Sequence, residues 1–162
     1  MAAAPAVAPW LHGPYGNWGI DLAVVGATVL AVALCVLIHY EALSLLSRHL
    51  GHLGVRRRRR VLYGIFGVLA VHVVEIWIFG MAYFLLLLAG SAFGNIHGLA
   101  TTSLFDHVYF SAVTYTTVGF GDVIPAGPVR FLAGTEALCG FVLITWSASF
   151  TYLEMDRFWR HD

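Results

Sequence analysis

The chain has 162 residues, of which 59% are apolar and 11% are charged, and its acidic and basic side chains balance to a net charge of zero. Because soluble domains are nearer half apolar and about a quarter charged, this composition excludes an ordinary soluble domain and indicates a membrane protein. Zero net charge gives no indication of a nucleic-acid partner.

The N-terminal segment, residues 1–19, is rich in Ala, Pro and Gly and carries no Arg or Lys. It therefore lacks the positive region of a signal peptide and is expected to be loosely ordered. Three later stretches are apolar and long enough to cross a bilayer, which takes about 20 residues. The last turns of the first stretch are amphipathic, so residues 40–54 either continue through the membrane or lie along its inner interface. The three stretches are residues 20–46, 61–89 and 129–153.

Arginine placement sets the expected orientation of these stretches. The 48–60 loop holds most of the basic residues, the segment 90–128 has none, and two more follow the third span. Since positive charge gathers on the cytoplasmic side, the loop and the C-terminal tail, residues 156–162, are predicted to be cytoplasmic. The segment before the third span would then face outward, in a multi-pass protein of the cell membrane. The run that sets this topology, and that would also hold anionic lipid, is Arg56, Arg57, Arg58, Arg59 and Arg60.

The segment 94–127 is too polar to span the membrane and too apolar for a solvated loop. Ser103 can cap a short helix over residues 104–114, whose C-terminal end would direct its partial negative charge toward the residues that follow. Those residues, 116–125, read Thr-Thr-Val-Gly-Phe-Gly-Asp-Val-Ile-Pro. Alternating glycines allow backbone conformations that other residues resist, and carbonyl groups that all point at one axis can replace the hydration shell of a potassium ion.

The string from Thr116 to Asp122, followed by Pro125, resembles the selectivity filter of the potassium channel family, Thr-Val-Gly-Tyr/Phe-Gly-Asp. The resemblance implies an all-α membrane protein in which residues 61–155 form a pore domain of outer helix, pore helix with filter, and inner helix. One extra hydrophobic helix and the Arg-rich loop, residues 20–60, would precede it. Potassium would be the permeant ion, conducted passively without a cofactor or covalent chemistry. The carbonyl groups expected to coordinate it belong to Thr117, Val118, Gly119 and Phe120, with the Thr117 hydroxyl added at the inner end and Gly121 completing the strand.

One chain supplies one filter strand, so a ring of carbonyl groups needs several copies about an axis, which implies a cyclic homo-oligomer. The resemblance implies a homotetramer in a lipid bilayer. Two alternatives from other classes remain open. One is a non-conducting regulatory channel subunit, and the other is an intramembrane metal-dependent protein.

Departures from the family pattern concern the residues that support the filter. Val113 occupies a position that is acidic in many members, so Asp122 lacks that carboxylate partner. Phe110 and Phe120 stand where many members pair a Trp with a Tyr, so the surroundings of the filter would depend on packing. Glu136, about seven residues into the third span, either supplies the missing acidic partner behind the filter or forms an ordinary hydrogen bond to a neighbouring helix.

The third span is expected to line the pore and to carry its gate. Gly134 and Gly140 are small residues of this span, and they either form a hinge or mark close helix packing. Phe141, Ile144 and Ala148 share one helical face below Gly140 and are predicted to line the pore.

Two histidines and two glutamates lie within the first two spans, namely His39, Glu41, His72 and Glu75. The simplest interpretation is a hydrogen-bonded network between the two helices. Because histidine titrates near physiological pH, such a network could also be proton-sensitive. A metal site in a helical bundle uses the same residue types, although two His and two Glu are too few for a dinuclear enzyme site.

Overall fold

The computed structural model describes residues 18–52, 57–99 and 103–159. Most of the segment 1–19, expected to be loosely ordered, lies outside the described residues, but Trp18 and Gly19 already belong to the first helix. The elements in chain order are α1 (Trp18–His52), α2 (Arg57–Ala89), the 3-10 helix η2 (Ser91–Phe93), β1 (Asn95–His97), α3 (Leu104–Tyr115), β2 (Ile124–Ala126) and α4 (Val129–Trp159).

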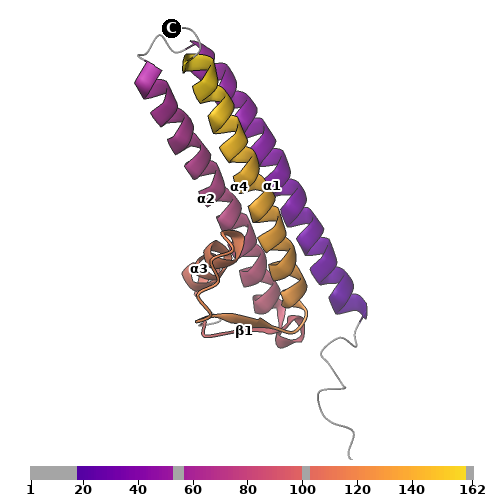
Figure 1. The fold of residues 1–162 in the computed structure, drawn as a ribbon. Coiled ribbons are helices and arrows are strands. Elements are labelled where there is room, and N and C mark those ends of the chain that lie inside the picture. The colour runs from indigo at the N-terminus through magenta and orange to yellow at the C-terminus, as the bar shows by residue number, and fades with distance from the viewer. Residues whose placement is uncertain (1–17, 53–56, 100–102, 160–162) are drawn as a thin grey trace, which may run out of the picture.

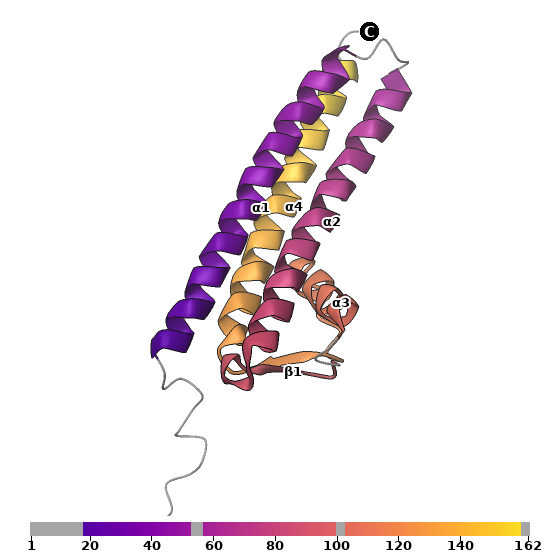
Figure 2. The same ribbon diagram turned by 180° about the vertical axis from the view of Figure 1, so that it is seen from behind.

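The three long helices lie side by side in a bundle, and α3 and the two strands gather at one end of it (Figures 1 and 2). α1 packs against both α2 and α4, and α3 also packs against α2 and α4. Each long helix contains a stretch that is long and apolar enough to cross a membrane: Trp18–His49, Val61–Ala89 and Val129–Asp156. The fold is therefore that of an all-α membrane protein, as the sequence predicts.

Apolar runs form helices in a membrane because a helix pairs its own backbone N–H and C=O groups, whereas the hydrocarbon around it offers them no hydrogen bonds. α1 continues as one helix to His52, so the structure has no break near residue 40 that would turn residues 40–54 onto the membrane surface. α4 ends at Trp159, so residues 156–159 of the expected tail belong to the helix. Both helices are longer than hydropathy alone indicates.

Two three-residue strands close the segment between α2 and α4. β1 and β2 pair antiparallel, with Ile96 opposite Pro125 at the centre. Ile96 is buried while its neighbours Asn95 and His97 are exposed, so the pairing holds one apolar side chain inside the protein. The strands join the chain before α3 to the chain after it. The sequence pattern does not indicate either strand, because three residues are too few to show a period of two.

Side chains between the helices form a narrow core, whose largest members lie beside α3. Outside this core, large apolar side chains face away from the protein, and Phe66, Leu88 and Leu138 are 67%, 64% and 65% exposed. An apolar surface of this extent suits contact with lipid tails or with other membrane chains. The core includes Cys35, Phe79, Tyr83, Tyr115, Leu132 and Leu143.

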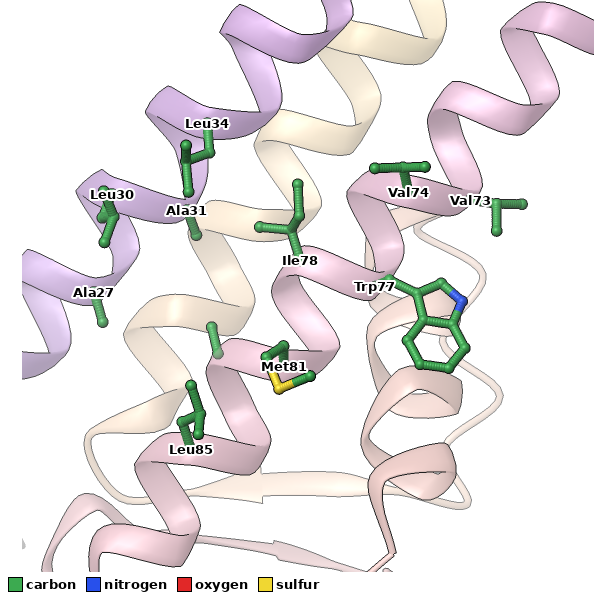
Figure 3. Close-up of a pocket in the computed structure, with 11 residues that line it drawn as sticks. Ala27, Leu30, Ala31, Leu34, Val73, Val74, Trp77, Ile78, Met81 and Leu85 are labelled. Carbon is green, nitrogen blue, oxygen red and sulfur yellow. The ribbon is translucent and has the colours of Figure 1, made fainter.

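Part of the outer surface is an apolar groove between α1 and α2 (Figure 3). Ala27 and Ala31 of α1 face Ile78 of α2 across it, and their small side chains leave the space between the helices open. Trp77 lies on the side of the groove nearer α3, where its ring meets Phe105 edge-on with centroids 5.7 Å apart. The residues that line the groove carry no charge, so it continues the apolar outer surface of the bundle.

Candidate functional site

α3 begins and ends with specific hydrogen bonds. At its start the Ser103 side chain accepts a hydrogen bond from the Asp106 amide at 3.3 Å, and the Asp106 carboxylate in the first turn suits the positive end of the helix dipole. The helix runs to Tyr115, one residue beyond the expected range of 104–114. The predicted cap and short helix are confirmed, and the residues that resemble a filter begin directly at the helix C-terminus.

The non-helical segment directly after α3, residues 116–122, has an alternating backbone; it lies outside β1 and β2, and we call it the exposed strand. Thr117, Gly119 and Gly121 have positive φ angles of 59°, 52° and 82°, whereas Val118 and Phe120 between them do not. Thr117 is the only non-glycine residue in the described part of the chain with a positive φ, a conformation that costs an L-residue about 1–2 kcal/mol. Backbone strain of this kind gathers at functional sites, where the surrounding structure maintains it.

The amides of this strand point back toward α3. The Thr117 amide donates to the Thr114 carbonyl at 2.9 Å, and the Gly119 amide donates to the Val113 carbonyl at 3.1 Å. Since each residue carries one donor and one acceptor, these two amides are committed to the helix end, while the carbonyl oxygens of residues 117–121 accept none of these bonds and are left for other partners. Residues 116–122 are all exposed in a single chain, so the strand can meet an ion or a neighbouring copy.

The outer end of the strand is held by a side chain of α3. The Tyr109 hydroxyl donates to Asp122 Oδ2 at 2.7 Å. This hydrogen bond raises the pKa of the Tyr109 phenol above its ordinary value, because losing the proton would place two negative charges side by side. Asp122 thus has a hydroxyl partner in place of the carboxylate that Val113 cannot supply. Sequence reasoning missed Tyr109, although its position 13 residues before Asp122 in a filter-like motif is a usable signal.

Glu136, for which the sequence left two interpretations open, is fully buried. Its carboxylate accepts hydrogen bonds from Tyr83 Oη at 2.6 Å and from Ser111 Oγ at 2.5 Å. The structure therefore does not show the pairing with Asp122 that the sequence left open as one of two interpretations: Glu136 bonds to Ser111 in α3, and Asp122 bonds to Tyr109. Of the two interpretations, the hydrogen bond to neighbouring helices describes the structure, and it joins α2, α3 and α4 at one carboxylate.

The aromatic residues near the filter are separated in a single chain. Phe110 is buried and meets Tyr83 edge-on with ring centroids 4.9 Å apart, and Val113 is buried beside it in α3. Phe120, in contrast, is 71% exposed. Packing therefore supports Phe110 within the chain, while Phe120 is left to contacts outside it.

α4 passes very close to the C-terminal end of α3. A Cβ atom at Gly140 would overlap the Tyr115 carbonyl group, whereas a Cβ atom at Gly134 would meet nothing within 4 Å. Gly140 therefore marks close packing, while α4 runs through both glycines as one helix. The side chains predicted to line the pore, Phe141, Ile144 and Ala148, are exposed in a single chain.

The polar residues of the first two spans form one cluster, which we call the histidine–glutamate cluster: His39, His72, Glu75, Tyr115 and Ser147. His39 Nδ1 donates to Glu75 Oε1 at 2.9 Å, and His72 Nδ1 lies 2.9 Å from Glu75 Oε2. The Tyr115 hydroxyl donates to the same Oε2 at 2.5 Å. The predicted network is confirmed for three of its four residues, and α3 and α4 add two that the sequence does not indicate.

Glu41 does not belong to this cluster, because its side chain lies on the exposed face of α1. The Arg-rich run is only partly described. Arg56 lies outside the described residues, Arg57 begins α2, and Arg59 is exposed near the start of that helix.

Three apolar helices, a short helix that stops within the bundle and an exposed strand of alternating backbone define a membrane pore protein. The chain belongs to the ion channel family, which matches residues 61–152 and therefore more than half of its length. No solved structure matches it.

Two curated relatives add detail to this assignment. The chain is 37% identical over 67 residues to protein LctB of Geobacillus stearothermophilus, covering 41% of this chain and 47% of the relative. It is 39% identical over 56 residues to the inward rectifier potassium channel Kirbac3.1 of Paramagnetospirillum magnetotacticum, covering 34% of this chain and 19% of the relative. The chain thus spans less than half the length of either relative.

We expect Gly140→Ala to destabilise the protein by about 1–3 kcal/mol, the usual cost of overpacking, because the added methyl group would overlap the Tyr115 carbonyl group. Thermal unfolding in detergent measures the effect. Gly134→Ala is the matched control on the same helix, where the methyl group has open space. Equal melting temperatures for the two variants would contradict this account of Gly140.

We expect Tyr109→Phe to loosen the outer end of the strand, because it removes the hydroxyl that holds Asp122. Amide hydrogen exchange of the peptide that covers residues 116–125 should become faster than in the wild type. Tyr152→Phe removes the same hydroxyl from an exposed side chain of α4 and serves as the control. Unchanged exchange in Tyr109→Phe would show that the hydrogen bond does not restrain the strand.

Proposed function

We propose that this chain forms a potassium-selective channel in which several copies, four by resemblance, surround one axis. The observation that carries the proposal is the exposed strand, in which the amides of Thr117 and Gly119 donate to α3 and the carbonyl oxygens of residues 117–121 are left for other partners. Non-helical backbone at membrane depth is tolerated only inside protein or beside water. A ring of such strands around a central path meets that condition, and a single chain does not.

Potassium passes such a ring because carbonyl oxygens replace the water that the ion loses. The carbonyl groups of Thr117, Val118, Gly119 and Phe120, with the Thr117 hydroxyl, would supply these oxygens. α3 ends immediately before the strand, so the negative end of its dipole faces the inner side of the path and stabilises a cation there. Conduction is then passive and follows the ion gradient. The similarity to Kirbac3.1, an inward rectifier potassium channel, supports the choice of ion.

The exposed surfaces of α4 and the strand fit the same assembly. Phe141, Ile144 and Ala148 would line the path below the filter, and Phe120 would be covered by the neighbouring copy. α1 packs against α2 and α4 and would stand at the outside of the ring. The distribution of arginines favours an orientation in which the loop before α2 faces the cytoplasm, near anionic lipid, and the filter faces outward.

The test is potassium flux into liposomes that contain only the purified protein, with sodium for comparison and barium as blocker. We expect barium-sensitive flux that favours potassium. Native mass spectrometry should give about four times the 17.7 kDa chain mass. Flux of both cations alike would contradict selectivity, and a tetramer without flux over a range of lipids would favour the non-conducting regulatory subunit.

A pair of glycine variants separates the filter from the rest of the protein. Gly119 and Gly26 both have open space where a Cβ atom would go, but only Gly119 has a positive φ. We expect Gly119→Ala to abolish potassium selectivity, because the backbone resists that conformation when a Cβ atom is present. Gly26→Ala in α1 should conduct as the wild type does. Normal selectivity in Gly119→Ala would contradict the assignment of residues 117–121 as the filter.

A further inference from the structure

The histidine–glutamate cluster lies where α1, α2, α3 and α4 approach one another. His39 comes from α1, His72 and Glu75 from α2, Tyr115 from α3 and Ser147 from α4. His39 and Glu75 are fully buried, while the His72 side chain is 13% exposed. His39 is 13 residues from the end of α1, which places it roughly 20 Å along the helix from that end at 1.5 Å per residue. Ionisable groups so deep in an apolar bundle are costly, and they usually serve a function.

The two imidazole rings and the carboxylate converge on one point. His39 Nδ1 and His72 Nδ1 each lie 2.9 Å from a different oxygen of Glu75. One ligand atom from each of the three residues lies within 4.8 Å of the others. Two imidazole nitrogens and one carboxylate oxygen are a donor set that zinc accepts, with bonds of about 2.0–2.2 Å.

The observed spacing is close to the spacing that a bound ion needs. A tetrahedral ion with bonds near 2.1 Å separates its ligand atoms by about 3.4 Å. The two nitrogens face different oxygens of Glu75, so with one oxygen as the ligand a single 2.9 Å distance separates two ligand atoms, and that distance would lengthen slightly. The other separations between the ligand atoms lie within 4.8 Å and would adjust toward the same value. Three protein ligands leave a fourth position, next to the Tyr115 hydroxyl, which lies 2.9 Å from His72 Nδ1.

A second contact orients one of the ligands. Ser147 Oγ lies 3.4 Å from His39 Nε2, on the far side of the ring from Glu75. When Nδ1 binds a metal ion, the proton of a neutral imidazole sits on Nε2, where it needs an acceptor. Ser147 provides one, and partners of this kind fix the ring of a metal-binding histidine.

We propose that His39, His72 and Glu75 bind one divalent transition-metal ion of the zinc type, with Ser147 as the positioning residue for His39. The ion replaces the proton-mediated contacts between the three side chains and links α1 to α2 beside the last residue of α3. This binding does not depend on conduction, so it can be measured whether or not the protein passes potassium.

The experiment is calorimetric titration of Zn²⁺ into the purified full chain, freed of any polyhistidine tag, with Co²⁺ absorption to report the geometry. We expect one Zn²⁺ per chain and the visible bands of four-coordinate Co²⁺. His72→Gln should weaken binding by at least about 100-fold, since even the partners of metal ligands contribute 10–100-fold. His49→Gln is the matched control, because His49 is an exposed histidine of α1 outside the cluster.

Thermal unfolding keeps the proposal testable where a ligand variant folds poorly. An ion that binds only the folded protein raises its melting temperature, so Zn²⁺ should raise that of the wild type while Mg²⁺, which prefers oxygen ligands, should not. Ser147→Ala keeps all three ligands and should weaken Zn²⁺ binding about 10-fold. Absence of Zn²⁺ binding by the folded wild type would overturn the proposal, as would equal loss in His49→Gln or no loss in both His72→Gln and Ser147→Ala.

Discussion

Hydrocarbon offers no hydrogen bonds, and this constraint governs how the chain departs from a helix. The long helices satisfy it with their own backbones. The exposed strand after α3 cannot, and its amides at Thr117 and Gly119 donate instead to carbonyl groups in the last turns of α3. The cap at Ser103, the pairing of β1 with β2 and the close approach at Gly140 all keep α3 and its strand in place. The carbonyl groups of residues 117–121 accept none of the backbone hydrogen bonds found outside the helices and strands of the described chain, and this row of exposed oxygens is its chemically distinctive part.

Two buried carboxylates hold α3 from one side. Glu136 of α4 accepts a hydrogen bond from Ser111, and Glu75 of α2 accepts one from Tyr115. Ser111 and Tyr115 are four residues apart and therefore lie on the same face of α3. Each carboxylate also binds a second helix, Glu136 through Tyr83 and Glu75 through His39. Removing Glu136 would take away the acceptor of the buried Tyr83 hydroxyl, and a buried donor left without a partner costs more than the hydrogen bond itself contributes. Ser111 would keep the Ile76 carbonyl, and Tyr115 would keep His72 if Glu75 were removed.

Features set by nearby residues could be predicted from the sequence, and features set by distant ones could not. Hydropathy located the three spans, and a Ser followed by a carboxylate located the start of α3, because both signals are local. The contact of Tyr109 with Asp122 and the entry of Tyr115 into the cluster depend on how α3 sits in the bundle. Glu41 shows the limit most clearly. It lies two residues from His39, about 200° around a helix of 3.6 residues per turn, so it cannot share the buried face.

The close contact between Gly140 and Tyr115 fixes one point of α4, about which the rest of the helix could tilt. The part of α4 from Gly140 to Trp159 spans 19 residues, or roughly 28 Å at 1.5 Å per residue. A tilt of about 10° at Gly140 would therefore move the C-terminal end of α4 by about 5 Å. This part of α4 is also bonded to α1, because the Ser47 hydroxyl donates to the Glu154 carboxylate at 3.2 Å. Any tilt of α4 must therefore either break that hydrogen bond or move α1 as well, so α1 adds resistance to the tilting of α4.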